Sequence, residues 1–386
     1  MSESTPAAAT DPDAPSSDWP SWAIYLGCSW TWCIGMFLPV LLVRDYGFWS
    51  FIAFAVPNVA GAAAMGWMVR SPAQSARFCE AHRRACGVFS IVTVLFQAYF
   101  VGWMSQRLDI GAAVQAPLFL TLLVVMLLLM RSLARAGRVL AIVVAAGSWF
   151  IFAAIASYRH QAGVPGLALT SGPPGDLAAL AGVCALGFLL CPYLDLTFHH
   201  ARQQLAPSAA KKAFAVGFGV VFASMILFTL LYADLISMRH LREIVLVGIL
   251  LHMTVQCAFT AAAHLSVVPA SRWIVLPIAL AGLLALAGAW TRFDVLHFSG
   301  GEFVYRLFMA FYGLVAPAYV WIVGISSSQR ATRRQWIVLA IVLLLATPFY
   351  WVAFIEKQML WVLPGVAMVL ISRLFDAGSI RHRSTA

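Results

Sequence analysis

Runs of about twenty apolar residues, repeated along almost the whole chain, are the feature that most restricts its fold. A helix that crosses a hydrocarbon core of about 30 Å needs about 20 such residues, and about twelve runs meet this requirement. Because 62% of the residues are hydrophobic and only 10% are charged, the chain lacks the polar surface that a soluble domain exposes to water. The sequence therefore predicts an all-α integral membrane protein.

The order of these runs divides the chain into five parts. We expect a disordered cytoplasmic N-terminus over 1–21, because its Ser, Pro and acidic residues cannot bury enough apolar area to fold. Helices 1–5 follow over 22–158, an outer loop and helices 6–10 over 159–325, helices 11 and 12 over 326–375, and a cytoplasmic tail over 376–386. The predicted spans are Trp22–Val43, Gly47–Val69, Ala85–Gln106, Ala112–Met130, Val139–Tyr158, Leu177–His199, Ala213–Ile236, Glu243–Val268, Trp273–Thr291, Phe303–Ile325, Gln335–Ile355 and Gln358–Phe375.

The distribution of Lys and Arg predicts the orientation. Cytoplasmic loops of membrane proteins carry an excess of both residues. If the N-terminus is inside, most of the 25 basic residues lie on the cytoplasmic side, including the pairs at 83–84, 211–212 and 333–334. Orientation thus explains the net charge of +10 without a nucleic-acid partner. Arg far outnumbers Lys, which is typical of GC-rich bacterial genomes. We therefore expect a multi-pass protein of the cell (inner) membrane with both termini cytoplasmic.

Helix-breaking residues lie near the middle of two spans. The first span contains Gly35 and Pro39, and the sixth contains Pro192. Two interrupted spans at matching places, in halves of opposite topology, indicate the central site of a transporter. The alternative is that Gly and Pro are simply common in membrane helices.

A family resemblance supports the first interpretation. Segment Cys33–Pro39, followed by Tyr46 and Gly47, resembles the first helix of the amino acid–polyamine–organocation superfamily, which shares the LeuT-type fold. The sodium–solute symporters are the most similar group, since Cys257–Leu265 resembles their Ser-Thr motif and 202–212 loosely resembles their Gln-Arg loop. The resemblance implies a 5+5 inverted repeat with broken helices 1 and 6, plus two extra C-terminal helices. It also implies Thr260 as a sodium ligand, although Phe259 replaces the second hydroxyl residue of the motif.

Candidate substrate-binding residues lie at the two breaks and on helices 3 and 8, which flank the breaks in this fold. Asp195 follows Pro192 within an apolar run, where a carboxylate is costly and usually faces a cavity. It would bind a cationic group or carry a coupling proton; the alternative is a solvated helix-end residue near His199, His200 and Arg202. Packing and interhelical hydrogen bonds are the alternatives for the other candidates. The full set is Trp30, Cys33, Gly35, Gln97, Cys191, Tyr193, Asp195 and Gln256.

Three functions fit these features. The first is a secondary active transporter that moves a small organic solute by alternating access, with sodium or protons as the coupling ion and the lipid bilayer as its surroundings. The second is a transporter-like sensor or partner subunit that no longer transports. The third is a membrane enzyme with His199, His200 and Asp195 at the cytoplasmic face. Since metalloprotease, P-loop and nucleophile-elbow motifs are absent from the sequence, we expect no enzyme and no cofactor besides the sodium ion.

Overall fold

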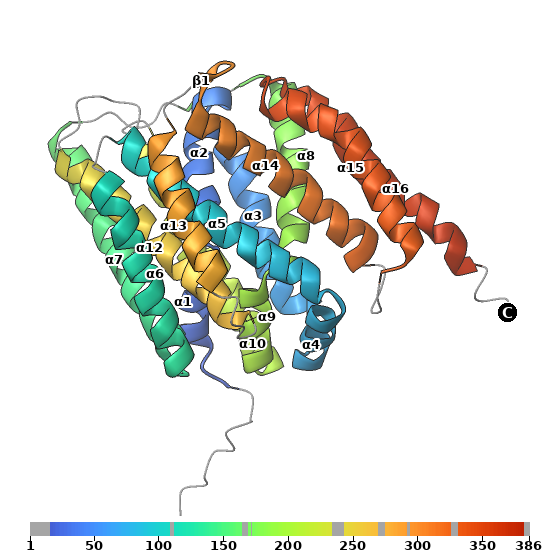
Figure 1. Cartoon of the computed structure of the whole chain (residues 1–386), viewed down its shortest axis with the longest axis horizontal. Coiled ribbons are helices and arrows are strands. Elements are labelled where there is room, and N and C mark those ends of the chain that lie inside the picture. The colour runs from blue at the N-terminus through green and yellow to red at the C-terminus, as the bar shows by residue number, and fades with distance from the viewer. Residues whose placement is uncertain are drawn as a thin grey trace, which may run out of the picture.

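The computed structural model describes residues 16–108, 112–163, 169–170, 172–233, 243–268, 275–291, 294–325 and 331–381. Most of the predicted N-terminal segment, part of the predicted outer loop over 159–175 and the last five residues of the tail therefore lie outside the described residues. The described part is a bundle of tilted helices with one short hairpin at its upper end (Figure 1). Strands β1 (Asp294–Val295) and β2 (Phe298–Ser299) form this hairpin, with Asp294 opposite Ser299.

The helices follow the predicted order. Helix α4 (Pro72–Ala81) was not predicted; Ser71 caps it and Pro72 occupies its first turn. The others are α1 (Trp19–Trp30), α2 (Cys33–Tyr46), α3 (Trp49–Met68), α5 (Arg83–Arg107), α6 (Ala112–Ser132), α7 (Ala136–Gln161), α8 (Pro174–Leu190), η1 (Cys191–Leu194), α9 (Leu196–Gln204), α10 (Pro207–Val216), η2 (Gly217–Phe222), α11 (Ala223–Tyr232), α12 (Glu243–Val267), α13 (Val275–Trp290), α14 (Gly300–Tyr319), η5 (Val320–Gly324), α15 (Arg333–Phe354), η6 (Met359–Trp361) and α16 (Val362–Arg381).

Several of these helices are long and apolar enough to cross a membrane. Among the described residues nine meet this test by length and composition, and ten if α1 and α2 are one bent span. Two shorter apolar helices, Val275–Trp290 and Met359–Leu374, lie where the ninth and twelfth spans are predicted. Apolar side chains such as Phe150 and Leu344 are exposed on the outer helices, as expected for side chains that face lipid. The multi-pass membrane architecture is therefore confirmed.

The first predicted break exists, but its predicted position is wrong. Gly35 is helical within α2, and the chain leaves the helix at Thr31 and Trp32, where α1 and α2 meet at a bend of 54°. Two carbonyls in the last turn of α1 accept hydrogen bonds from side chains at the bend. The Thr31 hydroxyl donates to the Gly27 carbonyl at 2.8 Å, and the Trp32 indole donates to the Ser29 carbonyl at 2.7 Å. These bonds satisfy the end of α1 and let the chain turn. Gly35 instead allows Phe222 to pack against α2.

The second predicted break is confirmed near Pro192. Helix α8 tightens into the 3₁₀ segment η1, and Asp195 then adopts an extended conformation before α9 begins. Pro192 has no N–H to continue the α-helical pattern of hydrogen bonds. Asp195 also caps α9, since its side chain accepts from the N–H groups of Thr197 and Phe198. The chain is therefore interrupted in both the first and the sixth predicted spans.

Glycines let several helices cross with their backbones in contact. A Cβ at Gly61 of α3 would overlap the carbonyl of Phe188 in α8, and one at Gly217 would lie 2.7 Å from the carbonyl oxygen of Ala23 in α1. Helices α5 and α13 make the most extensive contact of this kind, through Gly102 and Gly288. Such crossings are typical of membrane helices, which associate by close packing of small residues.

Candidate functional site

The two breaks meet in the interior of the bundle. The Thr197 hydroxyl, at the start of α9, donates to the hydroxyl of Ser29 at the end of α1 over 3.1 Å. The rings of Trp30 and Phe198 pack beside this bond with centroids 4.9 Å apart. All four side chains are buried. Two segments that are far apart in the sequence, each at a helix end, therefore form one polar junction.

Asp195 is the charged residue of this junction. One carboxylate oxygen, Oδ1, accepts from the Thr197 N–H at 2.7 Å and from its hydroxyl at 2.6 Å. The residue has no exposed surface, and Arg202 does not contact it, because that guanidinium binds the carbonyls of Val69, Arg70 and Leu205. The alternative that Asp195 is a solvated helix-end residue is therefore wrong.

His264 of α12 completes the junction. Its Nε2 lies 3.6 Å from the second oxygen of Asp195, Oδ2, and both side chains are fully buried. Its Nδ1 lies 3.1 Å from the hydroxyl of Ser90 in α5. The edge of the ring faces Trp32 at the first break. The helices α5, α9 and α12 and the first break thus all contribute a polar or aromatic group.

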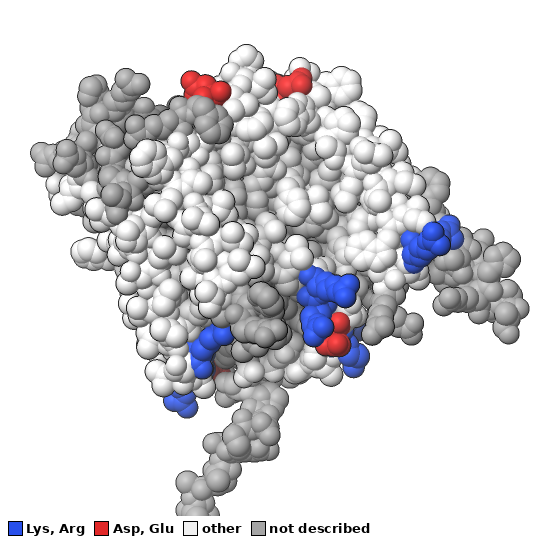
Figure 2. Space-filling view, viewed as in Figure 1, with Lys and Arg blue, Asp and Glu red and all other residues white. Residues whose placement is uncertain are grey.

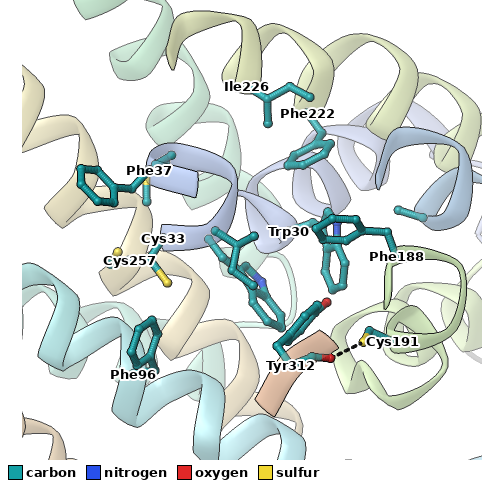
Figure 3. Packing of buried hydrophobic residues seen from close by; sticks show 14 of the residues in the cluster. Trp30, Cys33, Phe37, Phe96, Phe188, Cys191, Phe222, Ile226, Cys257 and Tyr312 are labelled. Atoms are coloured by element: carbon teal, nitrogen blue, oxygen red, sulfur yellow. Dashed lines mark hydrogen bonds between the residues drawn. The ribbon is translucent and has the colours of Figure 1, made fainter. Parts of the chain in front are cut away.

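Gln97, Cys33 and Cys257 form a second polar group above the first break. The Gln97 Oε1 accepts from the backbone N–H of Cys33 at 3.2 Å and from the thiol of Cys257 at 2.9 Å. The Cys33 carbonyl accepts from the Tyr305 hydroxyl at 3.1 Å. Figure 3 shows Cys33 near Cys257 and apart from Cys191, whose thiol donates to the Tyr312 carbonyl. Cys33 and Cys191 therefore contact different partners.

Two further candidates lie away from the junction. Gln256 donates to the Ser148 hydroxyl at 3.0 Å, on the side of α12 that packs against α7. The half-buried ring of Tyr193 packs against Phe78, beside α4. Interhelical packing, the alternative stated for both residues, describes these contacts.

Thr260 lies where the resemblance implies a sodium site, beside the end of α1. Its hydroxyl donates to the Cys28 carbonyl, near the end of α1, at 3.3 Å. The neighbouring carbonyls of Leu26, Gly27 and Ser29 each accept from a side chain of the same segment. Hard cations such as Ca²⁺ take about 6–8 oxygen ligands. Phe259 supplies no oxygen, so Thr260 is the hydroxyl that the motif retains beside these carbonyls.

An open cavity of about 760 Å³ adjoins the junction on one side. We call it the vestibule. It reaches Leu196, directly after Asp195, and Ser266, two residues after His264. Its lining includes Cys79, Glu80 and Arg83 from α4 and α5, and Arg138, His199, His200 and Gln203 from α7 and α9. The vestibule is thus a polar approach to the junction from the end of the molecule where α4, α9 and α10 lie (Figure 1).

An ion cluster closes the opposite end. Arg44 binds Asp45 and Glu302, while Arg306 binds the same two acids. Lys357, just after α15, lies 3.3 Å from Asp45. Glu302 and Arg306 lie four residues apart on α14 and belong to this larger set, which ties α2 to α14. The outer end of the helix that follows the first break is therefore fixed by charge.

The histidines proposed for an enzyme have structural partners. His199 contacts the Ser75 hydroxyl through Nδ1 at 2.8 Å and the Tyr193 carbonyl through Nε2 at 2.9 Å. His200 packs its ring against Trp22 and Tyr25. Since both nitrogens of His199 are engaged, nothing in this arrangement favours the enzyme alternative.

Sequence reasoning left Ser29, Thr197 and His264 outside the candidate set. The pairing of His264 with Asp195 depends on how two segments that are distant in the sequence pack together. Ser29 and Thr197 each lie within three residues of a break, which is the signal that points to them. No protein-family model matches the chain, and no curated protein matches it with significant similarity.

Proposed function

We propose that this protein is a secondary transporter with a LeuT-type core, which moves a small organic solute by alternating access. The observation that carries the proposal is the junction of two interrupted helices, with Asp195 in one break and Ser29 beside the other. Interrupted helices present backbone and polar groups to a solute inside the bundle. Ionisable residues within membrane spans are rare and often mark a solute or ion pathway.

Helix packing supports the inverted repeat. If α1 with α2 is helix 1 and α8 with α9 is helix 6, three of the main contacts between the two halves have counterparts five helices later. The contact of α3 with α8 corresponds to the contacts of α10, η2 and α11 with α1 and α2. The contact of α5 with α13 corresponds to that of α12 with α6. The contact of α1 with α7 corresponds to that of α8 with α14. Helices α15 and α16 pack mainly on each other and are the two additional helices.

The two ends of the molecule differ as an alternating-access cycle requires. The ion cluster closes one end, and the vestibule opens toward the junction from the other. This arrangement corresponds to an inward-facing state. Figure 2 shows that Lys and Arg gather near the lower end of the view and acidic residues at the upper end, with one acidic group among the basic ones. We therefore assign the vestibule end, and both termini, to the cytoplasmic side of the inner membrane.

One observation favours the alternative of a sensor or partner subunit. Aromatic rings of Trp30, Trp32, Phe198 and Tyr312 fill the space around the breaks. A solute can enter only if these rings move. A transporter must therefore change conformation at the junction, whereas a sensor that has lost transport keeps it packed.

Labelling of Cys79 tests the orientation. Cys79 lines the vestibule, and the other six cysteines are buried. We expect a membrane-impermeant maleimide to react in inside-out vesicles but not in right-side-out vesicles. Burial raises the pKa of the Cys79 thiol to about 12, and the thiolate is the reactive form. The rate should therefore rise about tenfold per pH unit between neutral and moderately alkaline pH.

The Cys79→Ser variant is the control and should remain unlabelled in both preparations. Reaction only in right-side-out vesicles would reverse the orientation. A rate that levels off near pH 8.5, the ordinary pKa of a free thiol, would contradict the raised pKa of Cys79.

A further inference from the structure

The two atoms that face each other between Asp195 and His264 are not used elsewhere. Asp195 Oδ2 and His264 Nε2 lie 3.6 Å apart, and neither has a hydrogen-bond partner among the described residues. In contrast, Oδ1 of the same carboxylate accepts three hydrogen bonds, from Thr197 and Phe198. Buried polar atoms nearly always have partners. The carboxyl group is therefore fixed by one oxygen and presents the other to the imidazole.

The imidazole is fixed in the same way. Nδ1 contacts the Ser90 hydroxyl at 3.1 Å, and the ring edge packs against Trp32. If the ring's own proton is on Nδ1 and is donated to the Ser90 hydroxyl, Nε2 of the neutral ring is an acceptor that faces Oδ2 of Asp195. One proton therefore fits between Oδ2 and Nε2, and the groups behind each atom hold both side chains in place.

The charge of this pair depends on that proton. The other titratable groups that interact with Asp195 are Tyr25 of α1, Cys86 of α5, His199 of α9 and Tyr312 of α14. No Lys or Arg of the described chain lies within ion-pair distance of Asp195. With one shared proton the pair is neutral overall, as carboxylic acid with imidazole or as carboxylate with imidazolium. Without it, a net negative charge is left in a buried site, which is costly.

The vestibule borders residues close in the chain to both members of the pair. The cavity borders Leu196 and His199 on α9 and Ser266 on α12, next to both members of the pair along the chain. The pair also contacts the first break, through Thr197 to Ser29 and through His264 to Trp32. Its charge therefore acts where the two interrupted helices meet.

We propose that Asp195 and His264 together form a proton-binding site, and that the coupling ion of the transport cycle is a proton. This inference rests on the proposed transport function. A proton from water in the vestibule binds between Oδ2 and Nε2, and the neutral pair keeps the breaks packed. Its return to water leaves a carboxylate that needs a new partner, which favours separation of the breaks.

Infrared difference spectroscopy tests the site with the proton as the only ligand. The full-length protein in lipid nanodiscs is titrated, and the carboxylic acid band is compared among wild type, Asp195→Asn and His264→Gln. His252→Gln is the matched control, because His252 is also buried on α12 and binds a serine, Ser148, through Nδ1. We expect one titrating band to vanish in Asp195→Asn, to move by at least one pH unit in His264→Gln, and to stay unchanged in His252→Gln.

Two results would overturn the proton site. One is an identical set of titrating bands in wild type and Asp195→Asn, and the other is an equal effect of His264→Gln and His252→Gln. If Asp195→Asn does not fold, the proton site is tested by comparing the titrating bands of His264→Gln and His252→Gln. The titration does not depend on transport, so it tests the proton site separately from the transport cycle. A pair that titrates in a protein whose vestibule never closes would support the proton site and contradict the proposed transport cycle.

Discussion

Replacement of Arg306 by Gln is expected to destabilise the protein by about 3–5 kcal/mol, since it leaves two buried carboxylates short of a partner. Arg306 binds both Asp45 and Glu302, and the three side chains are only 7–8% exposed. It also donates to the Phe354 carbonyl at 3.2 Å and packs on the ring of Phe298. Gln can replace at most one of these contacts. Thermal unfolding of the purified protein in nanodiscs measures the change.

Lys357→Gln is the control for this prediction. Lys357 binds the same carboxylate of Asp45, but its side chain is 40% exposed, and exposed pairs contribute only about 0–1 kcal/mol. Its melting temperature should therefore remain close to that of wild type. Equal decreases of the melting temperature in Arg306→Gln and Lys357→Gln would show that burial does not determine how much each ion pair stabilises the protein.

Replacement of Gly102 by Ala is expected to prevent normal folding. A Cβ at this position would overlap the carbonyl of Ala285, which is backbone and cannot move away by rotation of a side chain. Helices α5 and α13 would have to separate along their shared contact. Overpacking of this kind costs about 1–3 kcal/mol or more, and we expect the upper end of this range. Size-exclusion profiles and melting temperatures after mild solubilisation give the result.

Gly147→Ala is the matched control. Gly147 lies within α7, and a Cβ there meets nothing within 4 Å. Because Ala is a better helix former than Gly by about 1 kcal/mol, this variant should be as stable as wild type or slightly more stable. A loss as large as that of Gly102→Ala would contradict the close crossing of α5 and α13.

Local features of the sequence predicted the spans well. The predicted spans at 47–69 and 85–106 correspond to α3 (Trp49–Met68) and α5 (Arg83–Arg107), because the length of an apolar run is a local property. The position of the first break was missed. Gly35 is a helix breaker by propensity, yet tertiary packing keeps it helical, and the hydroxyl and indole donors of Thr31 and Trp32 end α1 four residues earlier.

The site could be predicted only in part, because its contacts join distant segments. Asp195 was found since a carboxylate within an apolar run is unusual by itself. Its partner His264 was not, because the pairing depends on how α9 packs against α12. In the same way, the ion cluster extends beyond the pair of Glu302 and Arg306, which one helix predicts, to Arg44 and Asp45 at the end of α2.

The distance across the vestibule tests the central claim of alternating access most directly. Arg77 of α4 and Arg135, next to Ala134, are exposed residues on two sides of the vestibule. Spin labels at Arg77→Cys and Arg135→Cys, in a Cys79→Ser background, report this distance by pulsed electron resonance. Arg44→Gln then weakens the link between α2 and α14 at the opposite end. We predict that it produces a second population with a shorter distance, as the vestibule closes when the ion cluster opens. An unchanged single distance, in a variant that remains folded, would contradict alternating access and favour the static sensor.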